Sequence, residues 1–263
     1  MSALYSRDYT VLTKNEIDEK NQLEAASIRP NSMFRANLYY DYSKAVRHNM
    51  SLFPNNFMDN ADLRQKCDEL ASQCDGLETL LQSKITELAI KRYIQDNGYY
   101  HIPASIFQRY NFGHHAAYVF KEFHLGTSFT ADYLLVGDSS DGHQFVFVEF
   151  ENAYGNIIIG NGDFGDTIRK GINQIGDWRR FIESNYSAIT AEFKKCTTKQ
   201  LPDEFYSYDA TRMNYVVVAG RRDDYNDKAR SLRRALEKDS KIMLLHYDNL
   251  IDVARCTIGN WTY

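Results

Sequence analysis

Two glutamates, Glu149 and Glu151, end a stretch of sequence that is otherwise apolar. If residues 143–151 form a β-strand, alternate side chains point to opposite faces, and both carboxylates share one face with Phe145 and Phe147. Burying two like charges side by side is costly unless a positive charge lies between them. A divalent cation is the most direct source of that charge, so the pair indicates a metal site.

Asp132 supplies a third carboxylate from the preceding predicted strand, 129–136. The glycine- and aspartate-containing segment 137–142 is typical of a hairpin turn, which pairs the two strands antiparallel. The start of one strand then lies beside the end of the next, and Asp132 beside Glu149 and Glu151. Carboxylate oxygens are the ligands that Mg²⁺ prefers, with Mn²⁺ as a possible substitute. The alternative is that Glu149 and Glu151 are solvated residues at a fraying strand end and that Asp132 is an acid near a turn.

A helix is predicted over residues 166–185, because isoleucines and a tryptophan recur there at helical spacing. Lys170, Gln174 and Asp177 are four and three residues apart, so they share one helical face beside the apolar stripe. Glu87, in a helix predicted further upstream, either extends the metal site or is an ordinary surface glutamate. These side chains are the candidates for completing a site around the three acids.

The predicted elements follow the order helix, three strands, helix, strand, helix, strand and helix. A strand meander followed by helix–strand alternation predicts an α/β (α+β) fold, with a mixed central sheet flanked by helices. The predicted helices span 77–97, 166–185 and 226–238, with a short last helix capped by Asp248, and the predicted strands span 117–125, 129–136, 143–151, 215–219 and 242–246.

The first 75 residues show no sustained periodicity apart from a candidate helix at 62–72. We therefore divide the chain into an N-terminal accessory segment, 1–75, and a main domain, 76–263. The composition, with 43% hydrophobic and 25% charged residues, is that of a globular protein. If the aromatic residues of the first segment are the active part, the chain is a structural interaction protein.

The formal net charge of −4 gives no sign of a basic coat for nucleic acid, although a local basic patch is compatible with it. No segment resembles a signal peptide, and the apolar runs are too short to span a bilayer. We expect a cytoplasmic protein that makes no membrane contact. Most of the 19 tyrosines and 15 phenylalanines should fill the core or an oligomer interface.

Several fragments together resemble the nuclease domain of the Shedu antiphage defence proteins, in the PD-(D/E)xK superfamily. Each fragment is short, and the resemblance depends on their order and spacing over roughly residues 76–263. They are Ala131-Asp132-Tyr133-Leu134-Leu135, Phe147-Val148-Glu149-Phe150-Glu151, Gln174-Ile175-Gly176-Asp177-Trp178, Tyr215-Val216-Val217-Val218-Ala219-Gly220-Arg221 and His246-Tyr247-Asp248-Asn249-Leu250.

The resemblance implies a Mg²⁺-dependent endonuclease that cleaves DNA in bacterial defence and forms homo-oligomers, such as dimers or tetramers. Asp132 and Glu149 would ligate the metal, and Glu151 would accept the proton of the attacking water or help to hold a second metal. Gln174 would orient water or phosphate. The family pattern has Lys where this chain has Glu151, so Lys170 is either a replacement for that lysine or a plain surface residue.

The glutamate at position 151 keeps a second function open. In that alternative the chain is a catalytically silent nuclease fold that works as a nucleic-acid-binding sensor or assembly module. The main basic clusters either contact phosphates or pair along the surface, Arg230 with Asp227 and Arg233 with Glu237. These clusters are Arg221 with Arg222, and Arg230 with Arg233 and Arg234.

Overall fold

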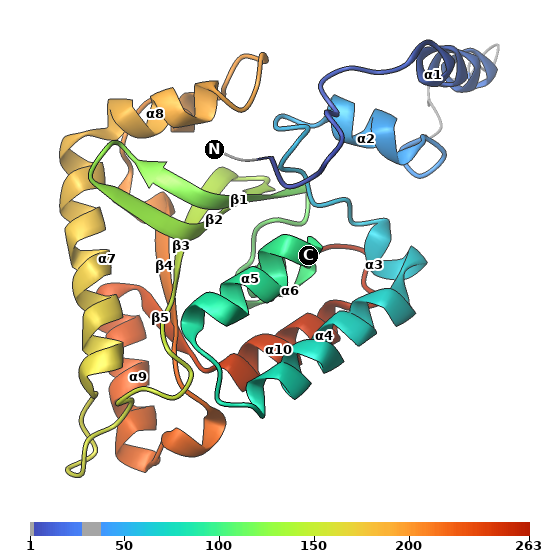
Figure 1. The fold of residues 1–263 in the computed structure, drawn as a ribbon. Coiled ribbons are helices and arrows are strands. Elements are labelled where there is room, and N and C mark those ends of the chain that lie inside the picture. The colour runs from blue at the N-terminus through green and yellow to red at the C-terminus, as the bar shows by residue number, and fades with distance from the viewer. Residues whose placement is uncertain (1–2, 28–37) are drawn as a thin grey trace.

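A five-stranded mixed sheet forms the centre of the computed structural model, which describes residues 3–27 and 38–263 (Figure 1). The spatial order of the strands equals their order in the sequence. The first three strands form an antiparallel meander, and the last two run parallel to the third. The predicted mixed sheet is confirmed. Its strands are β1 (Ala116–Leu125), β2 (Phe129–Ser139), β3 (Gly142–Phe150), β4 (Met213–Val218) and β5 (Ile242–Leu245).

Helices cover both faces of this sheet, which gives three layers (Figure 1). Phe145 and Phe147 point into the core under α7, α8 and α9, whereas Val146 and Val148 point into the core under α4, α5, α6 and α10. The predicted alternation along β3 is therefore confirmed. The first group comprises α7 (Asp166–Ser184), α8 (Tyr186–Lys194) and α9 (Asp227–Ser240), and the second comprises α4 (Cys67–Leu81), α5 (Glu87–Asn97), α6 (His101–Ala104) and α10 (Tyr247–Thr257).

The single helix predicted over 77–97 is wrong, because the chain there forms the end of α4 and the whole of α5. Lys84 has a φ of 49°, in the left-handed region that interrupts a helix. Thr86 then caps α5 by accepting a hydrogen bond from the Ala89 N–H. The apolar spacing continues across this break, which is why periodicity alone does not detect it.

Two further helix predictions need correction. The helix expected at 62–72 breaks at Lys66 into α3 (Asp62–Gln65) and α4, because Lys66 has a non-helical backbone. Asp248 does not cap α10: His246 Nδ1 accepts the Asn249 N–H at 3.0 Å, while the Asp248 carboxylate binds Arg221. In addition, α8 follows α7 in a stretch for which the sequence predicts no helix, and it buries Ile189 and Phe193.

The N-terminal segment contributes to the outer edge of the sheet. The Met58 N–H donates to the Ala117 carbonyl at 2.8 Å, and the Val119 N–H donates to the Asn56 carbonyl at 2.9 Å. By contrast, α1 (Lys14–Ala26) buries no residue and lies at the periphery beside α2 (Lys44–Met50) (Figure 1). Helix α4 continues across residue 75, and the proposed division there stays a prediction. Residues 1–2 and 28–37 of the segment lie outside the described part.

None of the helices in residues 3–27 and 38–263 combines the length and the apolar content that crossing a membrane requires.

Candidate active site

The three predicted acids come together where β2 begins and β3 ends. The Phe150 N–H, between Glu149 and Glu151, donates a hydrogen bond to Asp132 Oδ2 at 2.8 Å. Glu149 and Glu151 are 5% and 2% exposed, so neither is a solvated acid at a fraying strand end. The prediction that antiparallel pairing brings Asp132 beside the two glutamates is confirmed.

Glu151 follows the last residue of β3, and neighbouring elements fix its backbone on both sides. Its N–H donates to the Val218 carbonyl at 2.8 Å, and its carbonyl accepts from the Tyr247 hydroxyl at 2.8 Å. Helix α7 packs closely over it at Gly171, where an added Cβ would lie 3.3 Å from the Glu151 Cγ and 2.9 Å from a Val217 methyl group. Gly171 and Tyr247 therefore position the site, a role that no sequence pattern indicated.

Buried oxygen atoms of the two glutamates lack partners. Glu149 Oε2 and Glu151 Oε1 accept no hydrogen bond from any residue in the described ranges. Burial, with the Asp132 and Glu151 carboxylates nearby, raises the pKa of Glu149 to about 9. Burial also raises the pKa values of Asp132 and Glu151, although lysine partners oppose this effect. Such orphaned acceptors are uncommon in folded proteins and indicate a place for a missing partner.

Two lysines provide positive charge at this site. Lys91 on α5 donates to Asp132 Oδ1 at 2.9 Å and lies 2.8 Å from Glu87. Lys170 on α7 donates to Glu151 Oε2 at 2.8 Å, although its side chain is 62% exposed. The structure thus places Lys170 and Glu87 next to the acids. Lys91 was missed, because in the sequence it is one of several charged residues on an amphipathic helix.

Gln174 lies one turn beyond Lys170 on α7 and is half-buried. Its side chain makes no hydrogen bond to another residue of the described chain, so its predicted role with water or phosphate stays a prediction. Asp177, which shares the helical face, forms an ion pair with Arg180.

The donor chemistry of the three acids fits a hard divalent cation, and the two orphaned oxygens fit a ligand set that is incomplete without one. In this structure the side chains are not arranged to hold an ion: residues 3–27 and 38–263 contain no group of three or more His, Cys, Asp or Glu side chains placed to coordinate one. Lysines occupy one oxygen of Asp132 and one of Glu151 instead. The metal assignment to Asp132, Glu149 and Glu151 stays a prediction.

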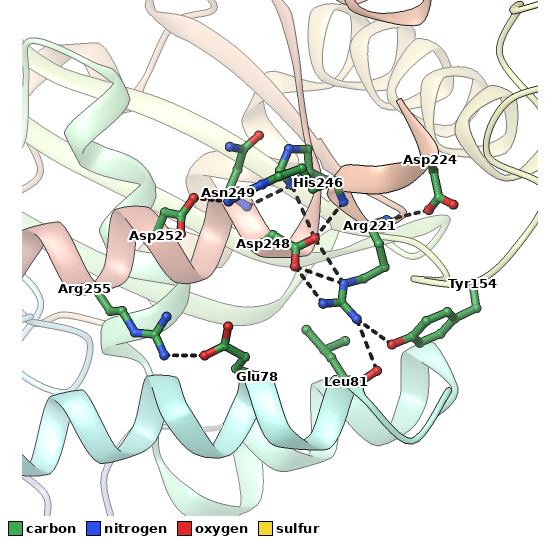
Figure 2. A network of polar contacts seen from close by, with 11 residues as sticks. Glu78, Leu81, Tyr154, Arg221, Asp224, His246, Asp248, Asn249, Asp252 and Arg255 are labelled. Atoms are coloured by element: carbon green, nitrogen blue, oxygen red, sulfur yellow. Dashed lines mark hydrogen bonds and ion pairs between the residues drawn. The ribbon is translucent and has the colours of Figure 1, made fainter. Parts of the chain in front are cut away.

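A second charged network lies at the C-terminal ends of β4 and β5 (Figure 2). Arg221 binds Asp248 through Nε and Nη2, and its Nη1 donates to the Tyr154 hydroxyl at 2.8 Å and to the Leu81 carbonyl at 3.3 Å. This guanidinium joins β4 to α10, to the end of α4 and to the loop that follows Glu151. A cavity of about 500 Å³ lies beside it, away from the three acids.

Most of the arginines considered for phosphate contact have protein partners. Arg222 pairs with Asp252, and Arg230 pairs with Asp227 as the surface alternative predicted. The predicted pairing of Arg233 with Glu237 is wrong, because Arg233 donates instead to Asn249 Oδ1 at 3.2 Å. These pairings favour a structural role for the basic clusters.

A family model described as the C-terminal part of Shedu protein SduA matches residues 80–251. The chain belongs to the Shedu family. Every acid and lysine of the site lies within the matched region, and so do Gly171 and Tyr247. Membership in this family points to a part in antiphage defence. No curated protein matches this chain.

Proposed function

We propose that this Shedu protein is a metal-dependent endonuclease of the PD-(D/E)xK type, which nicks or cuts DNA in antiphage defence. The observation that carries the proposal is the meeting of three carboxylates at adjoining strand ends, of which Glu149 and Glu151 are buried and each have one oxygen that lacks a partner. A purely structural core has no use for such a group, because each orphaned acceptor costs about 1–3 kcal/mol. Assembly into homo-oligomers is an expectation from the resemblance alone.

Asp132 and Glu149 would hold a Mg²⁺ ion, with Mn²⁺ as a substitute. When bound, the ion would offset charge on the phosphate and lower the pKa of a nearby water. The Phe150 N–H fixes Asp132 Oδ2, so Asp132 would reach the ion through Oδ1, the oxygen that Lys91 contacts in this structure. Glu151, whose Oε1 has no partner, would accept the proton of the attacking water. Lys170 would bring positive charge to the phosphate, and Gln174 would orient the water or the phosphate.

A second candidate is a catalytically silent nuclease fold that senses nucleic acid or assembles with partners. It is favoured by the glutamate at position 151 and by the two lysines that already neutralise carboxylates of the site. In that case the lysines are permanent ion-pair partners and the acids hold no metal.

Cleavage of supercoiled and linear DNA separates the two candidates. Wild type is compared with Glu149→Gln, which keeps the shape of the side chain, and with Asp18→Asn, an exposed acid on α1. We expect Mg²⁺- or Mn²⁺-dependent cutting by wild type and Asp18→Asn, and a loss of at least about 100-fold in Glu149→Gln. Equal cutting by all three proteins would refute the assignment of Glu149. No cutting by folded wild type would favour the silent fold.

A further inference from the structure

Lys91 is shared between two carboxylates that come from different elements. Its ammonium group lies 2.9 Å from Asp132 Oδ1 on β2 and 2.8 Å from Glu87, one turn earlier on α5. The side chain is 21% exposed, so water screens these contacts only partly. Lys91 therefore has two alternative anionic partners within reach, of which only Asp132 belongs to the predicted metal ligands.

Both oxygens of Asp132 are already engaged. Oδ2 accepts the Phe150 N–H, a bond between the ends of two paired strands that ties Asp132 to the sheet. Oδ1 accepts from Lys91. A cation that binds Asp132 at Oδ1 therefore competes with the positive charge of Lys91, and Glu87 gives the ammonium group a partner to keep when the cation displaces it.

We propose that Lys91 is a latch on the metal site: it occupies Asp132 while no cation is bound, and it is retained by Glu87 alone when a divalent cation takes Asp132 Oδ1. This proposal rests on the proposed function. It adds that Lys91 occupies one ligand of the same site until a divalent cation binds. In the cation-free chain, the ammonium group offsets the repulsion between the carboxylates of the site. A cation that binds these carboxylates must compete with it.

Lys170 is the matched control for Lys91, because it also contacts a predicted metal ligand but is more exposed and, among the described residues, has a single carboxylate partner. It also donates to a predicted ligand, Glu151, at 2.8 Å, but its side chain is 62% exposed. Within the described residues no second carboxylate lies within ion-pair distance of it. Removing Lys170 should therefore alter cation affinity much less than removing Lys91, because an exposed ion pair is well screened.

The test is calorimetric titration of the purified protein with MnCl₂ and MgCl₂ at pH 8, which requires no DNA cleavage. Site binding is defined as the heat that Glu149→Gln removes. We expect Lys91→Met to bind the cation about tenfold more tightly than wild type, because a competing positive charge next to the ligands is gone. Lys91→Arg keeps the charge and should bind as wild type does, and Lys170→Met should differ from wild type by less than about threefold.

Glu87→Gln gives a second test, whose expected effect has the opposite sign. Without Glu87 the ammonium group is held by Asp132 alone, so cation binding should weaken. In a double-mutant cycle this effect should largely vanish once Lys91 is replaced by Met, whereas a Glu87 that ligated the metal directly would matter in both backgrounds.

Tighter binding in Lys91→Met, together with weaker binding in Glu87→Gln that depends on Lys91, would support the latch. Wild-type binding with an unchanged or weaker affinity in Lys91→Met would overturn the latch and leave the metal site in place. No binding to wild type or to Lys91→Met would overturn the metal site, and the latch with it.

Discussion

Two charged networks of this protein differ in how fully their carboxylate oxygens are hydrogen-bonded. Around Arg221, the Asp248 carboxylate, the Tyr154 hydroxyl and the Leu81 carbonyl all receive donors from one guanidinium (Figure 2). Around Asp132, two carboxylate oxygens of the neighbouring glutamates receive no donor from the described chain. Both networks lie at strand ends, so position in the sheet does not explain the difference.

The pKa values report this difference in energetic terms. Burial alone would raise the pKa of Asp248, but the Arg221 guanidinium and the Arg222 N–H outweigh it and hold that pKa below its usual value. Burial raises the pKa of Glu149 to about 9, and the nearby Asp132 and Glu151 carboxylates add to the effect. The Arg221 network therefore stabilises the fold, whereas the acid site is destabilised at neutral pH until another positive charge arrives.

The largest effect on stability should follow from Arg221→Met. This change leaves Asp248 without its bidentate partner and releases the Tyr154 loop, so we expect the free energy of unfolding to fall by about 2 kcal/mol. Urea denaturation of the cation-free protein measures it. A loss below about 0.5 kcal/mol would mean that the network does not hold these elements together.

Glu149→Gln should have a smaller effect of the opposite sign. An acid whose folded pKa is about 9, against 4.5 ordinarily, makes the protein lose stability as pH rises from about 4.5 to 9. Glu149→Gln removes that loss, but its buried amide brings N–H donors that need partners of their own, so we expect the variant to be more stable than wild type by only about 1 kcal/mol at pH 8 without divalent cation. Its stability should also vary less with pH. Parallel pH profiles for the two proteins would contradict the unfavourable burial of Glu149.

The smallest effect should come from Arg222→Met, the matched control for Arg221. Arg222 and Asp252 form an ion pair with both side chains about half exposed, at 53% and 50%. Solvent screens such a pair, so we expect a change within about 0.5 kcal/mol in the same urea experiment. An effect as large as that of Arg221→Met would show that charge loss, not the buried network, controls stability here.

The part of the site that lies on strands was predictable from the sequence. A period of two places Glu149 and Glu151 on one face, and a hairpin turn brings Asp132 beside them, so local rules are sufficient. The sheet and its covering helices follow from the same alternation of strands and helices. Each of these inferences depends on residues that are close in the chain or joined by a short turn.

The remaining features depend on contacts between distant segments. Lys91 is 41 residues from Asp132 in sequence, and its position on α5 follows from the break at Lys84, which the apolar spacing does not reveal. In the sequence Arg221 is part of a basic cluster, and only the structure shows that Asp248 and Tyr154 lie beside it. A single sequence carries no signal for such pairings, because long charged side chains adapt to many partners.

The most direct test of the central claim is the number of divalent cations bound by the cation-free protein. Mn²⁺ titration followed by electron paramagnetic resonance, at pH 8 and without DNA, counts bound ions in wild type and in Glu149→Gln. The account predicts at least one saturable Mn²⁺ ion per chain in wild type that Glu149→Gln loses while it remains folded. Equal Mn²⁺ binding by both proteins, or none by folded wild type, would contradict the claim that the buried acids form a metal site.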